Sequence, residues 1–220
     1  MKTFLDGTAF RAVLFDIDNT LYRDTRYVEY QIEILIERLA EYRGESLEQT
    51  RRLVQRTRDE LERRDGRRPS LGNTFVALGI PITMSVAWRE ELIDPAAFLS
   101  ADPDLREILV QLSRSFRLLA ITNNPVSTGI RTLEVLGVAD LFETVVGLDT
   151  RHQSKPSWGP FEAALDAVGA GPAETVVVGD RYDVDLEPMI VRGGNGILLE
   201  HDGDLAEIPT ILIPRELNSE

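Results

Sequence analysis

The fold of this chain is indicated by one stretch, Ala12-Val13-Leu14-Phe15-Asp16-Ile17-Asp18-Asn19-Thr20, in which a short apolar run ends in two carboxylates. A strand places alternate side chains on the same face, so Asp16 and Asp18 can both point at one ligand where the strand ends. Two like charges held this close repel each other, and a fold keeps them where a cation or a proton-transfer task offsets the repulsion. The pair therefore indicates a catalytic or metal-binding site rather than a purely structural role.

The composition is that of a soluble globular protein. The chain has 220 residues, of which 43% are hydrophobic and 28% charged, so it can bury a core as one large domain or as a core with a smaller insert. Its formal net charge of −13 opposes a phosphate backbone, which argues against a nucleic-acid partner. With no cysteine, the chain can form neither a disulfide framework nor a thiolate metal site or nucleophile.

We expect a cytoplasmic protein with no membrane partner. No run approaches the roughly 20 apolar residues needed to cross a bilayer. The first residues also lack the apolar stretch of a secretory signal. The sequence leaves open whether the protein is a monomer or a homodimer.

Short runs rich in Val, Ile and Leu alternate with helical segments along the chain. This pattern predicts an α/β fold with a Rossmann-like, mostly parallel sheet and helices on both faces. The predicted strands are Ala12–Phe15, Leu118–Ile121, Thr144–Gly147, Thr175–Val178 and Gly196–Leu199, with a sixth candidate at Thr210–Ile213. The predicted covering helices are Asp104–Ser113, Pro160–Val168 and Val184–Arg192.

The first crossover is unusually long. Residues 16–117 separate the first predicted strand from the second, whereas a simple crossover needs only about a dozen residues. Helical spacing of apolar residues and strong helix formers predict helices over Tyr27–Tyr42, Leu47–Arg64 and Thr83–Leu92. We therefore predict a helical cap at residues 22–95, inserted into an α/β core of residues 1–21 and 96–220.

The second of these helices carries six arginines. Acidic and amide side chains alternate with them, so we interpret them as a solvated helix face rather than as a binding surface. The six are Arg51, Arg52, Arg56, Arg58, Arg63 and Arg64.

Polar residues follow the predicted strands at the edge where an open parallel sheet binds its ligands. They are Asp16, Asp18 and Thr20 after the first strand, Thr122, Asn123 and Asn124 after the second, Lys155 after the third, and Asp180, Asp183 and Asp185 after the fourth.

These residue types are suited to phosphoryl transfer. Several carboxylates without a thiol favour Mg²⁺ over zinc or copper. A cation held by Asp16 and Asp180 would offset their repulsion and also bind a phosphate oxygen. Lys155 would supply a second positive charge, and Thr122 and Asn123 would donate hydrogen bonds to the phosphoryl oxygens.

The two acids of the first motif fit two different tasks. Because no cysteine is available, the Asp16 carboxylate is the candidate nucleophile, which would form an aspartyl-phosphate. Asp18 can protonate the leaving oxygen and later take a proton from the attacking water.

The order and spacing of these residues resemble the four motifs of the haloacid dehalogenase-like hydrolase superfamily. The matching segments are Asp16-Ile17-Asp18-Asn19-Thr20, Thr122-Asn123, Lys155-Pro156, and Gly179-Asp180 with Asp185. The resemblance implies that Asp16 is the nucleophile, that Asp18 is the acid/base and offers a backbone carbonyl to Mg²⁺, and that Asp180 is a further metal ligand.

The same resemblance gives the remaining residues their expected places. It puts Thr122 and Lys155 on the phosphate and Asp185 near the metal. We also expect Thr20 and Asp185 to contact the residues that bind the metal and the phosphate. It also implies that the helical insert is a mobile cap that closes over the substrate and excludes water.

The fourth motif departs from the family pattern. It commonly reads Gly-Asp-Ser or Gly-Asp-Asn, and here it reads Gly179-Asp180-Arg181-Tyr182-Asp183. Arg181 is expected either to crowd the site or to pair with an acid, and Asp183 competes with Asp185 for the inner position. Asp18 argues for phosphate chemistry, because the dehalogenases that give the family its name lack an acid at this position.

The predicted function is a Mg²⁺-dependent phosphatase acting on a small phosphorylated metabolite. The sequence of residues 16–22 also resembles that of nucleotidase-like members of the superfamily, which makes a nucleoside monophosphate one candidate substrate. One alternative is a phosphomutase or phosphotransferase of the same family, which cap residues would decide. Another is a phospho-accepting, receiver-like regulatory module, although a receiver places its phosphorylated Asp after the third strand. A non-catalytic descendant of the fold is the remaining alternative.

Overall fold

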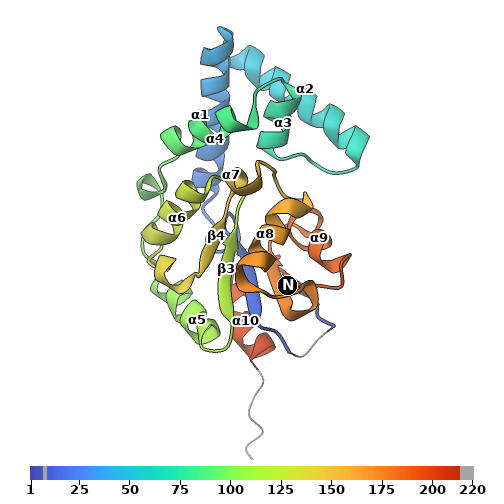
Figure 1. Ribbon diagram of the computed structural model, residues 1–220. Helices are drawn as coiled ribbons and strands as arrows, with labels where there is room; N and C mark the ends of the chain where they lie inside the picture. The colour runs from blue at the N-terminus through green and yellow to red at the C-terminus, as the bar shows by residue number, and fades with distance from the viewer. Residues whose placement is uncertain (7–8, 214–220) are drawn as a thin grey trace, which may run out of the picture.

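The computed structural model describes residues 1–6 and 9–213, and a six-stranded sheet lies at its centre (Figure 1). The strand order is β1-β6-β5-β2-β3-β4, and β1 alone runs antiparallel to its neighbour. The strands are β1 (Lys2–Phe4), β2 (Ala12–Asp16), β3 (Arg117–Ile121), β4 (Thr144–Val146), β5 (Thr175–Gly179) and β6 (Asn195–Leu198). The predicted mostly parallel α/β fold is confirmed.

Alternate residues of the central strands pack on opposite faces of the sheet. Val13 and Phe15 belong to the apolar core under α5 (Pro103–Ser113), α6 (Val126–Val135) and α10 (Asp204–Leu212). Ala12 and Leu14 belong to the core under α8 (Trp158–Val168) and α9 (Glu187–Ile190). The helices in Figure 1 divide between the two faces in the same way. Burial on both faces explains why these strands read as continuous apolar runs.

The sequence prediction was wrong at the sixth strand. Thr210–Ile213 is not a strand, because residues 204–212 form the helix α10. Ile208 and Leu212, four residues apart, share one face of that helix and are buried in the core. The outer edge of β6 is occupied instead by β1, a three-residue strand that is too short to show a pattern.

The segment predicted as one helix at Val184–Arg192 is two shorter pieces. A π-helical turn, η4 (Tyr182–Leu186), leads directly into α9. Four further short elements connect the larger ones: η1 (Pro95–Ala97), η2 (Ala139–Leu141), α7 (Leu148–Arg151) and η3 (Pro172–Glu174).

Of the helices between β2 and β3 in the chain, the first four gather at one end of the sheet (Figure 1). They are α1 (Thr25–Arg43), α2 (Leu47–Asp65), α3 (Leu71–Ala77) and α4 (Ile82–Leu92). The sequence predicts three of them, and it gives no signal for α3 because seven residues carry too little periodicity.

The ends of α1 and α2 follow from local sequence. The Asp24 side chain caps α1 by accepting two backbone N–H groups, and Ser46 forms a capping box with Gln49 at the start of α2. Gly44 and Gly66 end the two helices with φ of 66° and 71°, a left-handed conformation that suits glycine.

The apolar core runs from the sheet into these helices without a break. Tyr27 of α1 is fully buried, and its ring packs 5.4 Å from Tyr22 and 5.5 Å from Phe98 between ring centroids. The division into a cap at 22–95 and a core stays a prediction. Among the described residues, no helix has the length and apolar character that crossing a membrane requires.

Candidate active site

The site lies where β2, β3 and β5 end side by side. Asp16 is the last residue of β2, Thr122 follows β3, and Asp180 follows β5. Because these three strands are parallel neighbours, their carboxyl ends meet at one edge of the sheet. The structure therefore brings together side chains that are more than a hundred residues apart in the sequence, as the strand-end argument predicted.

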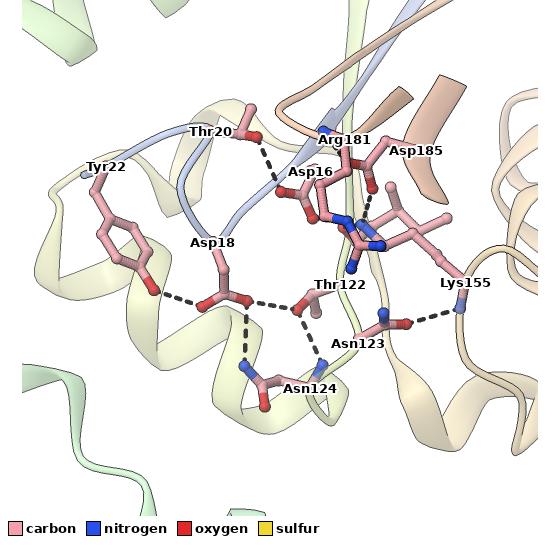
Figure 2. A network of polar contacts seen from close by, with 11 residues as sticks. Asp16, Asp18, Thr20, Tyr22, Thr122, Asn123, Asn124, Lys155, Arg181 and Asp185 are labelled. Atoms are coloured by element: carbon pink, nitrogen blue, oxygen red, sulfur yellow. Dashed lines mark hydrogen bonds and ion pairs between the residues drawn. The ribbon is translucent and has the colours of Figure 1, made fainter. Parts of the chain in front are cut away.

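Asp16 is at the centre of a buried ionic cluster (Figure 2). Lys155, in the loop between α7 and α8, donates from Nζ to Asp16 Oδ1 and to Asp185 Oδ1, the latter at 2.7 Å. Thr20 donates to Asp16 Oδ2 at 2.9 Å. These four side chains come from three segments that are far apart in the sequence, and each residue is at most 5% exposed.

Burial and like charge dominate the electrostatics of the cluster. Burial raises the pKa of Asp16 well above its ordinary range, Lys155 opposes this shift, and the neighbouring carboxylates add to it. Burial and the Asp185 charge raise the pKa of Asp180 to about 6. Burial alone would lower the pKa of Lys155, but the Asp16 and Asp185 carboxylates outweigh it and raise that pKa.

Three carboxylates of this cluster are placed to hold a cation. Asp16, Asp180 and Asp185 each offer an oxygen, and the three oxygens lie within 4.8 Å of one another. One lysine faces three acids, so the cluster carries excess negative charge, and its donors are the hard oxygens that suit a divalent ion such as Mg²⁺. The residues present fit such an ion.

The backbone at Gly179 lets the cluster form. A Cβ at this position would lie 2.4 Å from the Cβ of Asp185, so only glycine allows Asp185 to approach the end of β5. The backbone N–H of Arg181 then donates to Asp185 Oδ2 at 3.0 Å. Glycine at 179 is required by this close contact rather than by an unusual φ.

Asp18 lies in a separate network of neutral groups (Figure 2). Its Oδ1 accepts hydrogen bonds from the Tyr22 hydroxyl and from Gln31 Nε2, the latter at 2.9 Å. Its Oδ2 accepts from Thr122 Oγ1 and Asn124 Nδ2, both at 3.2 Å. Asn124 also donates to Gln31 Oε1 at 2.8 Å, which closes the ring of contacts. The Asp18 carboxylate is thus not part of the three-acid cluster, and the metal ligand predicted from this residue is its backbone carbonyl.

A tight turn after β2 makes this separation possible. Asn19 has φ of 62°, and the backbone N–H groups of Thr20 and Leu21 both donate to the carbonyl of Ile17. The turn leaves Thr20 beside Asp16, while Asp18 projects toward α1.

Of the three predicted phosphate-binding residues, Lys155 is part of the cluster, and Thr122 and Asn123 each have a hydrogen-bond partner. Thr122 donates to Asp18 and accepts from the backbone N–H of Asn124 at 3.0 Å. Asn123 accepts from the backbone N–H of Lys155 at 2.7 Å, which fixes the loop that carries the lysine.

The fourth motif resolves into an inner and an outer acid. Asp185 is 2% exposed and contacts Lys155, whereas the Asp183 side chain is 39% exposed and accepts from Arg181 at 2.9 Å. Of the two outcomes predicted for Arg181, pairing with an acid is observed, and the same residue also borders the space beside Lys155 and Asp18.

Sequence reasoning missed most of the partners of Asp18. Gln31 lies on α1 and its residue type gives no sign that it turns inward. Tyr22 is four residues from Asp18, but nothing in the sequence shows that the chain turns back between them. Asn124 stands directly after the predicted phosphate-binding pair, but its position in the sequence alone assigns it no role.

Comparison with known proteins assigns the family. A model of the haloacid dehalogenase-like hydrolase family matches residues 10–191, and the chain belongs to that family. Pyrophosphatase PpaX of Bacillus pumilus is 28% identical over 182 residues, which are 81% of this chain and 78% of that protein. Glyceraldehyde 3-phosphate phosphatase of Methanopyrus kandleri is 31% identical over 200 residues, 84% of this chain and 79% of that protein.

A solved structure agrees on the fold. The crystal structure of a HAD phosphatase from Thermococcus onnurineus has a TM-score of 0.61 and 22% sequence identity, and the match covers 92% of this chain and 98% of that one. The family predicted from the four motifs is confirmed, as is the prediction that the chain is an enzyme of a hydrolase class.

Proposed function

We propose that this protein is a Mg²⁺-dependent phosphatase that hydrolyses a small phosphomonoester through a covalent bond to Asp16. The observation that carries the proposal is the placement of Asp16, which ends β2 beside a buried ammonium group and two further carboxylates. The family match and the relatives named as phosphatases support the same reaction class.

In the first step, an oxygen of the Asp16 carboxylate attacks phosphorus. The new O–P bond forms as the ester P–O bond breaks, and Asp18 gives the departing alkoxide a proton. Lys155 stabilises the negative charge of the phosphoryl oxygens. Thr122 donates to them once its hydroxyl leaves Asp18, and the Asn123 amide N–H donates while its Oδ1 keeps the contact with the Lys155 backbone.

In the second step, water attacks the phosphorus of the aspartyl-phosphate. Asp18, now deprotonated, takes the proton from that water, and cleavage of the O–P bond releases inorganic phosphate and restores the Asp16 carboxylate. Tyr22, Gln31 and Asn124 hold the Asp18 carboxyl group in place through both proton transfers.

Asp16 and Asp180 would hold the metal ion, together with the backbone carbonyl of Asp18 and with Asp185 close by. When bound, the ion neutralises the clustered carboxylates and the charge on the phosphoryl group. Thr20 and Lys155 fix the orientation of Asp16 through contacts with its two carboxylate oxygens.

The helices at residues 22–95 would act as the cap that excludes water from this site. The nucleoside monophosphate, the cytoplasmic location and the monomeric or dimeric state stay predictions from the sequence.

The test is phosphate release from an aryl phosphate and from a panel of phosphorylated metabolites, nucleoside monophosphates included, each with Mg²⁺ and with a chelator. We expect release with Mg²⁺ that the chelator abolishes. An isomerised phosphoester with little free phosphate would show a phosphomutase instead. No turnover of any panel member would overturn the proposal.

A further inference from the structure

A cavity of about 230 Å³ lies between Asp18 and the helices α1, α2 and α4, and three arginines border it. They are Arg58 from α2, Arg89 from α4 and Arg181 from the fourth motif. Asp18 is the one acid that borders this cavity among the described residues. The space equals that of several water molecules at about 30 Å³ each, which is enough for a carboxylate or phosphate group on a short linker.

Arg89 is a buried cation without an acidic partner. It is 4% exposed, and its guanidinium donates to the carbonyl of Ser85 at 3.1 Å and to the Ser85 hydroxyl. Across residues 1–6 and 9–213 it forms no ion pair. Burial lowers the pKa of Arg89 to about 10, against the influence of Asp18. An unpaired charge at this depth is costly, and a bound anion would offset that cost.

Arg58 differs from the other arginines of its helix. The sequence predicts one solvated face for all six, and Arg51 and Arg52 do pair with surface glutamates. Arg58 instead turns inward, and its Nε is buried with no hydrogen-bond partner within the described chain. Burial and the positive charges of Arg68 and Arg181 lower the pKa of Arg58. The prediction of a solvated face is therefore wrong for this residue.

The cavity adjoins the space over the catalytic lysine. A larger cavity of about 650 Å³ reaches Lys155, and the two cavities share Pro69, Ser70, Asn123 and Arg181 in their walls. An elongated substrate can therefore place one end near Lys155 and the other between Arg58 and Arg89. Neither wall contains an aromatic ring from the described residues, so a nucleobase finds no stacking platform there.

We propose that the substrate carries a second anionic group, a carboxylate or a phosphate, a few bonds from its phosphoester, and that Arg58 and Arg89 bind this group. The planar guanidinium of arginine can bind either a carboxylate or a phosphate through two parallel N–H···O hydrogen bonds. The inference rests on the proposed function, because it places the second group relative to a phosphoryl group at Asp16.

The test is to measure the dissociation constants of phosphonates by calorimetry. Their P–C bond is not hydrolysed, so binding is measured without turnover. Ethylphosphonate, phosphonoacetate and methylenediphosphonate share the phosphoryl end and differ in a neutral, carboxylate or phosphonate second group. Phosphonoacetate and methylenediphosphonate carry an anionic group at each end. We expect one of these two compounds to bind the Mg²⁺-loaded protein about ten- to a hundredfold more tightly than ethylphosphonate. The compound that gains more identifies the second group.

The preference should depend on Arg58 and Arg89 and not on the exposed arginines of α2. Arg58→Gln should reduce it to about twofold or less, Arg89→Gln should do the same if that variant folds, and Arg52→Gln on the exposed face of α2 should leave it unchanged. Equal binding of all three compounds to the unmodified protein, or a preference that survives Arg58→Gln, would overturn the inference. A preference without turnover of any phosphoester would reject the proposed function and leave the anion site standing.

Discussion

Asp16 and Asp18 are two residues apart, yet their surroundings differ in kind. Asp16 lies beside a buried ammonium group and near two acids. Asp18 is held by four neutral donors, two from the end of β3 and two that lie toward or on α1. The two carboxylates share no hydrogen-bond partner among the described residues. A fixed cation suits a carboxylate that must attack as an anion, and neutral donors suit a carboxyl group that must give and take a proton.

The sharpest way to break this comparison is Asp16→Asn. We expect kcat to fall by about 10⁴-fold or more for every substrate, because the neutral carboxamide is a far poorer nucleophile than the Asp16 carboxylate. Lys155 keeps its contact with Asp185 in this variant, so circular dichroism and thermal unfolding should show a folded protein. Asp166→Asn, an exposed acid on α8, is the matched control and should retain activity. Activity within tenfold of the unmodified enzyme would rule out Asp16 as the nucleophile.

Asp18→Asn should have the next largest effect, and one of a different form. We expect kcat for alkyl phosphates to fall by about 10²–10⁴-fold, since their leaving oxygen needs a proton. An aryl phosphate with an acidic phenol needs less help and should lose less. A plot of log kcat against the pKa of the leaving group, for the unmodified enzyme and for Asp18→Asn, measures this difference between alkyl and aryl phosphates. An equal loss for all leaving groups would show that Asp18 is not the acid.

Lys155→Met tests the cation that distinguishes the two regions. The substitution leaves two buried carboxylates without their ammonium partner, so we expect the metal-free protein to lose about 3–5 kcal/mol of unfolding free energy in urea. Adding Asp16→Asn should restore part of that loss by removing one of the charges. Lys2→Met, which breaks a surface pair, is the control. A loss no larger than that of the control would contradict the ionic character assigned to the Asp16 region.

The smallest expected effect is a pH dependence of stability in the metal-free protein. The pKa of Asp180 is raised from 3.8 to about 6 in the folded state, so the native protein binds more protons than the unfolded chain between these values. Stability should therefore fall by roughly 1–3 kcal/mol as the pH rises from about 4 to about 6. Asp16 shifts in the same direction and adds to the slope.

Added Mg²⁺ and single substitutions identify which groups cause the fall of stability with pH. Saturating Mg²⁺ should flatten the dependence in thermal unfolding, and Asp180→Asn should reduce it, whereas Asp183→Asn, at the outer acid, should preserve it. A slope unchanged by Asp180→Asn would show that the shift lies elsewhere.

Much of the sheet and of the Asp16 cluster could be predicted from the sequence. Strands buried on both faces leave apolar runs, and parallel strands bring their carboxyl ends together, so the residue pattern alone was enough to group Asp16, Lys155 and Asp180. The three-residue β1 and the seven-residue α3 were missed because they are too short for a pattern, and the end of α10 was mistaken for a strand.

The surroundings of Asp18 and the inward arginines could not be predicted, because they depend on how helices pack over the sheet. Gln31 and Arg89 lie on helices whose exposed and buried polar residues look alike in sequence. Arg58 has the same local composition as Arg51 and Arg52, and only the placement of α2 against the cavity distinguishes it. Tertiary packing, rather than local propensity, decides which polar side chains reach the site.

The most direct test of Asp16 as the nucleophile is to find the phosphoryl group on the protein during turnover. Enzyme mixed with an aryl phosphate and Mg²⁺ is quenched in acid within one turnover, digested, and its peptides are weighed by mass spectrometry, with Asp18→Asn included to slow the second step. We expect one added phosphoryl group on the peptide that contains Asp16, at the Asp16 side chain, and its release by hydroxylamine. A phosphoryl group on another residue, or none while phosphate is being released, would contradict this role of Asp16.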